Sequence, residues 1–358
     1  MSVSAAPPSL RSICQQLYHD NPGIVRLDLA GWCIGDDGAA ALGTSFQHIS
    51  STLYLNLSYN LISAKGVSSM MHGILHFHTL DLCHNCIGDD GAVTIANALS
   101  STSWEGGMSW KVNNLFLRNN HISCKGAIYI SQALEKNNTV ENLDLGTNDI
   151  GSDGAIAIER LLKKNQTLRC LSLWSNNLKA SDVERISNGL HQNVALEVIN
   201  LGNNSVCDHG AEAISKMLRV NSTLSSIHIA KAAIEWKGAI KLAESLAYNS
   251  VVKVLDVLHN PIGLKGASAF CYSLRNFNRN IQKLRFDCLC EGKRESYTLS
   301  GVNKEILIYL KLNNSGRAKM SDVKLPWASW PIILQKINIE ADLLYLTLQE
   351  KPDLFRRD

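Results

Sequence analysis

The sequence predicts an α/β solenoid, an elongated array of strand–loop–helix units with a parallel sheet on its concave wall and helices on its convex wall. A short apolar pattern recurs nine times between residues 27 and 266. Within each copy the hydrophobic period changes from two residues to that of a helix. Repetition at a fixed period of roughly 20–50 residues is the signature of a solenoid. The copies begin at Leu27, Leu55, Leu80, Leu115, Leu143, Leu171, Ile199, Ile227 and Leu255, with a weaker tenth at Leu284.

Each copy opens with a predicted strand. When its first apolar residue is numbered 0, positions 0 and +2 are apolar and position +1 varies, which is the alternation of a strand with one buried face. From Leu115 to Leu255 each step is 28 residues. Position +5 is Asn in seven copies, and an amide can satisfy backbone groups where the chain turns, so we expect an Asn ladder inside the solenoid. Its members are Asn60, Asn85, Asn120, Asn148, Asn176, Asn204 and Asn260, with Ala232 in the eighth copy.

A predicted helix follows in every copy. Position +11 is Gly in eight of nine copies, with Asp182 the exception. Positions +12, +15 and +19 are apolar, which is one face of an amphipathic helix. The helix ends near an Asn at position +22, as at Asn165, Asn193, Asn221 and Asn249. Strands lie about 4.8 Å apart and helices about 10 Å apart, so stacking is expected to curve the array into a horseshoe with the sheet inside.

The ends of the chain depart from the repeat, and three parts are predicted: a helical cap over residues 1–25, about ten repeats over 26–290, and a helical extension over 291–358. In the extension, 291–302 is expected to be a loop, 304–312 a helix, and 327–339 and 341–349 two further helices. The extension is either a cap over the last repeat or a separate docking module. An insertion at 101–110, which carries Trp104 and Trp110, is either a contact loop or a surface loop packed on itself.

Composition and charge narrow the class of partner. The formal net charge is +3 and no large basic cluster is present, so neither nucleic acid nor membrane is an expected partner. The chain shows no secretory signal and no apolar stretch of the roughly 18–20 residues that cross a bilayer. A cytoplasmic location is predicted, with the nucleus as a possible alternative. The ten cysteines are scattered through the repeats and are expected to be reduced.

Known catalytic motifs do not occur in the sequence. It has no phosphate-binding glycine loop, nucleophile elbow or His-Glu-x-x-His motif. His78 and Cys83 belong to opposite ends of a predicted strand, roughly 16 Å apart, which is too far to share one metal ion. The Asp-Asp-Gly triplets at 36–38 and 89–91 lack the spacing of a calcium loop. We therefore predict a non-enzymatic protein with no cofactor and no metal.

The predicted binding surface is the concave wall, where positions +1, +3 and +4 are exposed. Phe116 and Arg118 share one strand and one face, and Trp174 follows two repeats later, with Gly146 between them leaving a notch. Exposed aromatic residues and Arg dominate the binding energy of interfaces. The predicted partner-binding residues are Tyr59, His84, Phe116, Arg118, Asp144, Trp174, His228, Leu258 and His259.

The pattern Leu-x-Leu-x-x-Asn-x-Ile followed by Gly-Ala and a full helix, as in residues 143–162, resembles the ribonuclease-inhibitor-like class of leucine-rich repeats. The resemblance covers roughly residues 9–290. It implies a right-handed leucine-rich-repeat solenoid, such as those of ribonuclease inhibitor, nucleotide-binding innate immune receptors and the Ran GTPase-activating protein. Ribonuclease inhibitor alternates two long repeat types and is strongly acidic, and this chain does neither.

Two functions are therefore predicted. The first is a non-enzymatic scaffold that binds a protein partner on the concave wall, since repeat arrays present extended binding surfaces. The alternative is a regulator of the GTPase-activating type that acts on a small GTPase. For that alternative, no residue of this chain is matched to the active loop of the Ran activator.

Overall fold

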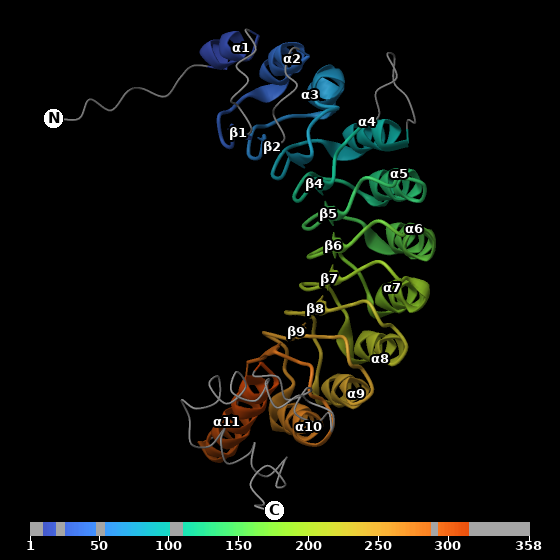
Figure 1. Cartoon of the computed structure of the whole chain (residues 1–358), viewed down its shortest axis with the longest axis vertical. Helices are drawn as coiled ribbons and strands as arrows, with labels where there is room; N and C mark the ends of the chain where they lie inside the picture. Colours follow the sequence, from blue (N-terminus) through green and yellow to red (C-terminus); the bar gives the residue numbers. More distant parts are fainter. Residues whose placement is uncertain (1–9, 19–25, 48–53, 101–109, 288–292, 315–358) are drawn as a thin grey trace, which may run out of the picture. The chain divides into compact units, whose positions relative to one another are not determined.

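A computed structural model describes residues 10–18, 26–47, 54–100, 110–287 and 293–314. Two compact units make up the chain, one formed by residues 1–178 and 188–196 and the other by 179–187 and 197–358. In both, short parallel strands alternate with helices, and the strands occupy one side and the helices the other (Figure 1). This is the predicted α/β arrangement of a leucine-rich-repeat solenoid.

The strands follow one another in sequence order and pair in register, so that residue 0 of one copy lies opposite residue 0 of the next, as Leu55 does with Leu80. The first unit holds β1 (Arg26–Asp28), β2 (Tyr54–Asn56), β3 (Thr79–Asp81), β4 (Asn114–Phe116), β5 (Asn142–Asp144) and β6 (Cys170–Ser172). The second holds β7 (Val198–Asn200), β8 (Ser226–His228), β9 (Val254–Asp256) and β10 (Lys283–Arg285).

Helices cover the opposite side of each sheet. The first unit contains α1 (Leu10–Tyr18), α2 (Gly35–Phe46), α3 (Ala64–Met70), the 3₁₀ helix η1 (Met71–Gly73), α4 (Gly88–Ser100), α5 (Cys124–Leu134) and α6 (Gly151–Lys164). Helix α7 (Ala180–Gln192) is divided between the units, and the second contains α8 (Cys207–Leu218), α9 (Trp236–Leu246), α10 (Gly263–Asn276) and α11 (Lys293–Asn314).

The core lies between the sheet and the helices and is built from the periodic apolar positions. In the fifth copy, every residue at positions 0, +2, +7, +12, +15 and +19 is buried: Leu143, Leu145, Ile150, Ala155, Ile158 and Leu162. Burying side chains of this size contributes roughly 1.5–3 kcal/mol each for the larger ones. The same positions face inward in each copy, so the core is continuous within each unit.

The predicted ladder of +5 asparagines is present. The Oδ1 atom of Asn85 accepts hydrogen bonds from the N–H groups of Asn60 and Ile62, each at 3.0 Å. Its Nδ2 atom donates to the carbonyl oxygens of Leu57 and Leu82, each at 2.9 Å. One buried amide thus satisfies backbone groups in two consecutive copies, which stabilises both turns and fixes their register.

Where the next copy has no Asn at +5, the turn adopts a local substitute. Ala232 replaces the ladder Asn in the eighth copy, and the N–H of Val206 in the copy before it donates to the carbonyl of Asn204, 3.0 Å away. In the last full copy, the N–H of Ile262 donates to the carbonyl of Asn260 at 2.8 Å in the same way. The +7 N–H is therefore bonded with or without the ladder, but its hydrogen bond links two copies only where the next copy supplies the Asn.

A second ladder runs along the helix ends, formed by the asparagines at +22. The Nδ2 atom of Asn165 donates to the carbonyl oxygens of Leu134 and Asn137 in the preceding copy, and its Oδ1 accepts from the N–H groups of Thr167 and Leu168. The same arrangement recurs at Asn249. These contacts explain why the sequence repeats an Asn at each helix end.

The loops that lead into the helices alternate between two conformations, so the sequence-based conclusion that the chain does not alternate two repeat types is wrong for these loops. Even-numbered copies have a left-handed residue at +6, at Leu61, His121, Asn177 and Ala233. Odd-numbered copies from the third onward have one at +8, at Gly88, Gly151, Cys207 and Gly263. The first copy has both, at Cys33 and Gly35. The uniform 28-residue step conceals this alternation because both loops contain the same number of residues.

An aspartate at +9 of an odd copy caps the helix of the next copy. Asp89 accepts hydrogen bonds from the N–H of Ser123 at 2.8 Å, from its hydroxyl at 2.6 Å, and from the N–H of Gly126 at 3.0 Å. Asp36 makes the same three contacts with Ser63 and Gly66, and Asp208 makes the two backbone contacts with Glu235 and Gly238. A carboxylate at helix amino termini satisfies free N–H groups and interacts favourably with the helix dipole.

In even copies this contact adds to the crowding by the +7 side chain that favours Gly at +11, and it bears on the exception at Asp182. A Cβ added at Gly126 would lie 2.7 Å from Oδ1 of Asp89, so a side chain there would displace the cap. The fifth copy has Ser152 at +9, and in the sixth copy Asp182 itself occupies +11. Its carboxylate accepts from the N–H of Lys179, 2.8 Å away, at the start of its own helix.

The two ends differ in part from expectation. Helix α11 begins at Lys293, so the loop predicted over 291–302 is wrong from that residue onward. Its buried half, with Ile306, Tyr309 and Leu312, packs against α10, and a helix propagates readily from such a segment because each added residue gains a hydrogen bond. The helices predicted at 327–339 and 341–349 lie outside the described residues.

Of the two tryptophans in the insertion at 101–110, only Trp110 is among the described residues. Trp110 is only 2 % exposed, so it belongs to the core and not to a contact loop or surface loop. Trp104 lies outside the described residues. None of the described helices has the length and apolar character needed to cross a membrane.

The ladder predicts a large asymmetry between two substitutions at the same repeat position. Asn85→Ala should lower the free energy of unfolding by about 2–4 kcal/mol, because it leaves buried N–H and C=O groups without partners. Ala232→Asn, which supplies an amide where the array lacks one, should leave stability within about 1 kcal/mol of the wild type or raise it. Urea unfolding followed by circular dichroism measures both. Equal losses for the two variants would show that the ladder amide is not the stabilising group.

The cap predicts an acid dependence. Burial raises the pKa of Asp89, but the hydrogen bonds from Ser123 and Gly126 lower it further, so the pKa lies below its usual value. A carboxylate with a lowered folded pKa stabilises the protein above its unfolded pKa of about 3.9, and the contribution is lost as the pH falls through the folded pKa. Asp89→Ala should therefore cost about 1–2 kcal/mol at neutral pH and flatten the acid limb of stability.

The matched control is Asp90→Ala. Asp90 is the exposed neighbour, paired only loosely with Lys125 at 3.9 Å. Its loss should change stability by less than about 0.5 kcal/mol at any pH between about 3 and 7. If the two variants show the same pH profile, Asp89 does not act as a helix cap.

Candidate functional site

The surface available for binding on the strand side is the sheet face, defined as the face turned away from the helices and formed by positions −1, +1 and +3. Position +4 forms its margin, because the residue there always turns the chain out of the strand with a left-handed backbone. Its φ lies between 52° and 59° at Tyr59, His84, Asn119, Thr147, Ser175, Asn203, Lys231 and His259. A left-handed residue other than Gly is uncommon, and here the turn imposes it on eight different side chains.

Three of these margin residues form a continuous group in the first unit. The rings of Tyr59 and His84 stack with centroids 4.1 Å apart and planes inclined by 7°. The Nδ1 atom of His84 lies 2.8 Å from Nδ2 of Asn119, which can donate to it. Tyr59 and His84, both predicted site residues, are thus brought together, and Asn119 joins them.

On the sheet face, polar side chains at +1 accept hydrogen bonds from the backbone N–H two residues further along the chain. Oδ1 of Asp144 accepts a hydrogen bond from the N–H of Gly146 at 2.8 Å, and Asp81 accepts from the N–H of Cys83 at 2.9 Å. Asn56, Asn200 and Asp256 make the equivalent contact two residues on. Asp144, predicted as a binding residue, therefore has one carboxylate oxygen engaged by the backbone.

Phe116 interrupts this polar row. It lies in register between Asp81 on β3 and Asp144 on β5 and, as an aromatic residue, offers no acceptor to the backbone. Phe116, Arg118 and Trp174 are all half-buried. Among the residues that the structure describes, none of their side chains has a hydrogen bond, ion pair or ring contact. In this part of the sheet face the side chains are free to contact another molecule.

The carboxylate of Asp144 lies on the strand between those of Arg118 and Trp174. A Cβ added at Gly146 would lie 2.9 Å from Oδ1 of Asp144 and 3.4 Å from the carbonyl oxygen of Trp174. Gly146 itself is buried, so the notch expected there stays a prediction, and the carboxylate of Asp144 places negative charge beside it. The first unit therefore presents aromatic, cationic and anionic groups within three consecutive strands.

Cys83, which lies on the same face, has a thiol whose surroundings favour its protonated form. Burial is the main reason that its thiol pKa is raised well above the usual value, and the negative charge of Asp81 raises it further. Since the thiolate is the nucleophile, a thiol held in this state is chemically inert near neutral pH. The described cysteines all carry free thiols.

The second unit holds a separate cluster on its sheet face. Asp256, whose side chain is largely buried, pairs with Arg285 at 3.0 Å, and Nδ1 of His228 lies 3.6 Å from the same carboxylate. Oγ of Ser226 lies 2.9 Å from Nε2 of His228. Next to this cluster, His259 pairs with Asp287. The predicted residues His228 and His259 thus already have intramolecular contacts, and Leu258, next to His259 in the sequence, is half-buried.

Ser226, His228 and Asp256 are the residue types of a nucleophile, base and orienting acid, but their geometry does not make such a set. The His228–Asp256 separation exceeds hydrogen-bond length, and the carboxylate is committed to Arg285 and to the N–H of Leu258. Within the described ranges, no three His, Cys, Asp or Glu side chains are placed to hold a metal ion.

Sequence reasoning missed two features, one in the loop beyond the margin and one on the sheet face. Leu61, at position +6, is 66 % exposed with a φ of +57°, although a bulky residue is unfavourable in this region. No pattern in the second copy alone reveals this, because it depends on the loop conformation. The Asp256–Arg285 pair was also missed, although the in-register positions of the two residues at +1 of consecutive copies could have revealed it.

Comparison with known proteins supports the repeat assignment. Residues 75–96, 136–158 and 248–271 match a family model described as Leucine Rich repeat. No curated protein matches the chain.

Several solved structures are similar. Actin-Binding Site 2 of Leiomodin-1 matches with 18% identity and a TM-score of 0.37, covering 46% of this chain and 96% of that one. The tropomodulin C-terminal domain of Caenorhabditis elegans matches with 10% identity and a TM-score of 0.36, covering 45% and 98%. An internalin of Listeria monocytogenes, inlF, matches with 16% identity and a TM-score of 0.40, covering 81% and 91%.

The three matched stretches, together with the in-order parallel strands and the intervening helices, establish that this chain carries leucine-rich repeats arranged as an α/β solenoid.

Proposed function

We propose that this protein is a non-enzymatic scaffold that binds a protein partner on the sheet face of the first unit, around Phe116, Arg118 and Trp174. Leucine-rich-repeat domains typically mediate protein–protein interaction. The observation that carries the proposal is that these three side chains have no hydrogen bond, ion pair or ring contact within the described part of the chain, whereas neighbouring polar residues on the same face are bonded to the backbone. Aromatic and Arg side chains of this kind are the residues that dominate interface energies.

The charges around Phe116 suggest what the partner presents. Asp81 and Asp144 flank the ring on adjacent strands, which lie about 4.8 Å apart, so a Lys or Arg side chain of the partner could lie over the ring between two carboxylates. Arg118, two residues along the strand, is suited to a carboxylate of the same partner. The partner surface is therefore expected to carry a basic residue and an acidic residue close together.

The remaining predicted residues divide into those that extend the proposed binding surface and those that lie outside it. Tyr59 and His84 extend the same surface toward its margin as a stacked pair. His228, Leu258 and His259 belong to the second unit and stay a prediction. The regulator of a small GTPase also stays a prediction, because no residue of the described surface is assigned to that activity.

The proposal predicts that the triple variant Phe116→Ala, Arg118→Ala and Trp174→Ala fails to recover the partner that the wild type captures from cell lysate. Loss of about 2 kcal/mol at any one of them would weaken binding about 30-fold. Quantitative mass spectrometry of the captured proteins provides the measurement, and thermal unfolding verifies that the variant is folded.

A double variant on the helix side, Tyr129→Ala with Arg160→Ala, is the control, since it also removes an exposed aromatic residue and an exposed Arg from the first unit. It should capture the same proteins as the wild type. Undiminished capture by the folded triple variant would overturn the assignment of the site.

A further inference from the structure

The helix side of the second unit carries a row of exposed apolar residues at one repeat position. The residue just before the Asn at the helix end is Val220, Tyr248 and Phe277 in three consecutive copies, where this Asn is at +22 in the first two and at +23 in the third. These side chains are 54 %, 72 % and 52 % exposed. At the same position the first unit has Lys136, Lys164 and Gln192. The fold therefore does not require apolar residues at this position.

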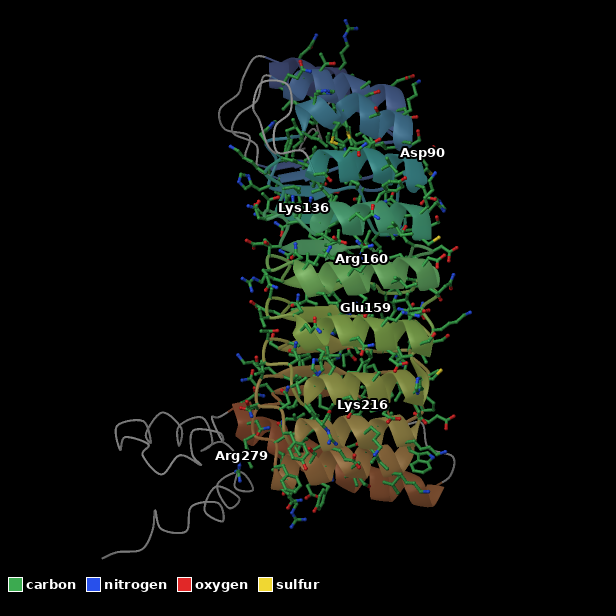
Figure 2. The ribbon with its side chains drawn as sticks, turned by 90° about the vertical axis from the view of Figure 1, so that its right-hand side faces the viewer. Asp90, Lys136, Glu159, Arg160, Lys216 and Arg279 are labelled. Carbon is green, nitrogen blue, oxygen red and sulfur yellow. The ribbon has the colours of Figure 1, made fainter. Side chains whose placement is uncertain are left out.

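A hollow of about 420 Å³ lies beside this row, between α9 and α10. Its lining combines small residues that are buried or half-buried with aromatic residues that are exposed. The Tyr272 ring packs edge-on against the Phe277 ring with centroids 5.8 Å apart, although Tyr272 remains 63 % exposed. The small lining residues are Ala243, Ala247 and Ala269, and the aromatic ones are Tyr248, Tyr272 and Phe277. Figure 2 looks onto this side of the molecule, where Arg279 lies just beyond the end of α10.

Charge is unbalanced at the α8 end of the hollow. The guanidinium of Arg219 lies 5.2 Å from the centre of the Tyr248 ring and 3.9 Å from the carboxylate of Glu244. Lys241 approaches the same carboxylate more closely, at 3.2 Å. Two cations therefore share one anion at this margin, and Arg219, the more distant of the two, is available to a carboxylate of a ligand.

The hollow and the row of exposed apolar residues beside it are together called the aromatic groove. We propose that the aromatic groove binds a proline-rich segment of a partner protein in the polyproline II conformation, with an acidic residue of that segment at the end that lies over α8. Stacked helices repeat at about 8–10 Å. A polyproline II helix presents the same face every three residues, or about 9.3 Å. Successive prolines on one face would therefore meet successive anchor positions on neighbouring helices. Aromatic-lined grooves are the usual receptors for such segments.

An amphipathic helix with anchors seven residues apart would match the spacing almost as well, at about 10.5 Å. The two exposed tyrosines distinguish the polyproline II segment from the amphipathic helix. Their hydroxyl groups can donate hydrogen bonds to a ligand backbone, and a polyproline II segment has free carbonyl groups whereas those of a helix are already bonded. Tyr248 and Tyr272 thus favour the extended, proline-rich ligand.

The test uses the full chain and a fluorescein-labelled peptide of nine prolines flanked by two glutamates, with binding followed by fluorescence anisotropy. The wild type should bind this peptide at least ten-fold more tightly than a Gly-Ser peptide of the same length and charge. Replacing the glutamates by lysines should weaken binding at least three-fold. Tyr248→Lys and Phe277→Lys should each raise the Kd at least ten-fold.

Lysine is the residue that the first unit carries at this position, so both variants are expected to fold, and an unchanged Tm verifies this. Lys136→Gln, at the equivalent first-unit position, is the matched control and should leave the Kd unchanged. The sheet-face triple variant should also bind the peptide normally, so failure here is distinct from failure of the proposed function.

Three results would overturn the proposal. One is equal affinity for the proline and Gly-Ser peptides. Another is unchanged binding by the two lysine variants. The third is a different occupant, shown either by tighter binding of an amphipathic helical peptide or by self-association in sedimentation that Tyr248→Lys abolishes.

Discussion

The structure depends on one interaction: the buried Asn amide at position +5, which bonds the backbone of its own copy and that of the copy before it. Asn85 alone satisfies two N–H groups and several carbonyls of two turns. Because a buried backbone group without a partner is costly, the amide imposes a common register on every copy that it joins. Strand pairing, core packing and helix position follow from that register.

This constraint divides the repeat positions into those whose side chains hold the fold together and those whose side chains can contact another molecule. Positions 0, +2, +5 and +7 are committed to the core and to the ladder, and many polar +1 residues are committed to the backbone two residues on. What remains free is a small set of side chains, of which Phe116, Arg118 and Trp174 have no intramolecular partner among the described residues. The helix side is divided in the same way, since position +21 or its equivalent is polar at Lys136 and apolar at Tyr248.

Most of the fold could be predicted from the sequence, because periodic apolar residues and a recurrent Asn encode the strand, the ladder and the helix directly. The alternation of two loops could not, since it depends on backbone angles at residues as different as Leu61 and Gly88. The sequence places Asp89 near a helix amino terminus, but that it caps the helix of the next copy was missed for a related reason, because only the stacking brings Asp89 and Ser123 together. For the site, the predicted face contains Phe116 and Trp174, and the in-register +1 positions of Arg285 and Asp256 could have indicated their pairing, but its distance and the burial of Asp256 depend on the folded structure.

The most direct test of the ladder is amide hydrogen exchange measured residue by residue by NMR. The N–H groups of Ile62 and Ile122 donate to ladder amides of the next copy, whereas those of Val206 and Ile262 donate only to a carbonyl two residues back in their own turn. All four residues are buried. The ladder predicts that Ile62 and Ile122 exchange as slowly as the strand amides and that Val206 and Ile262 exchange faster. Equal protection of all four amides would show that burial alone, and not the Asn ladder, holds the turns.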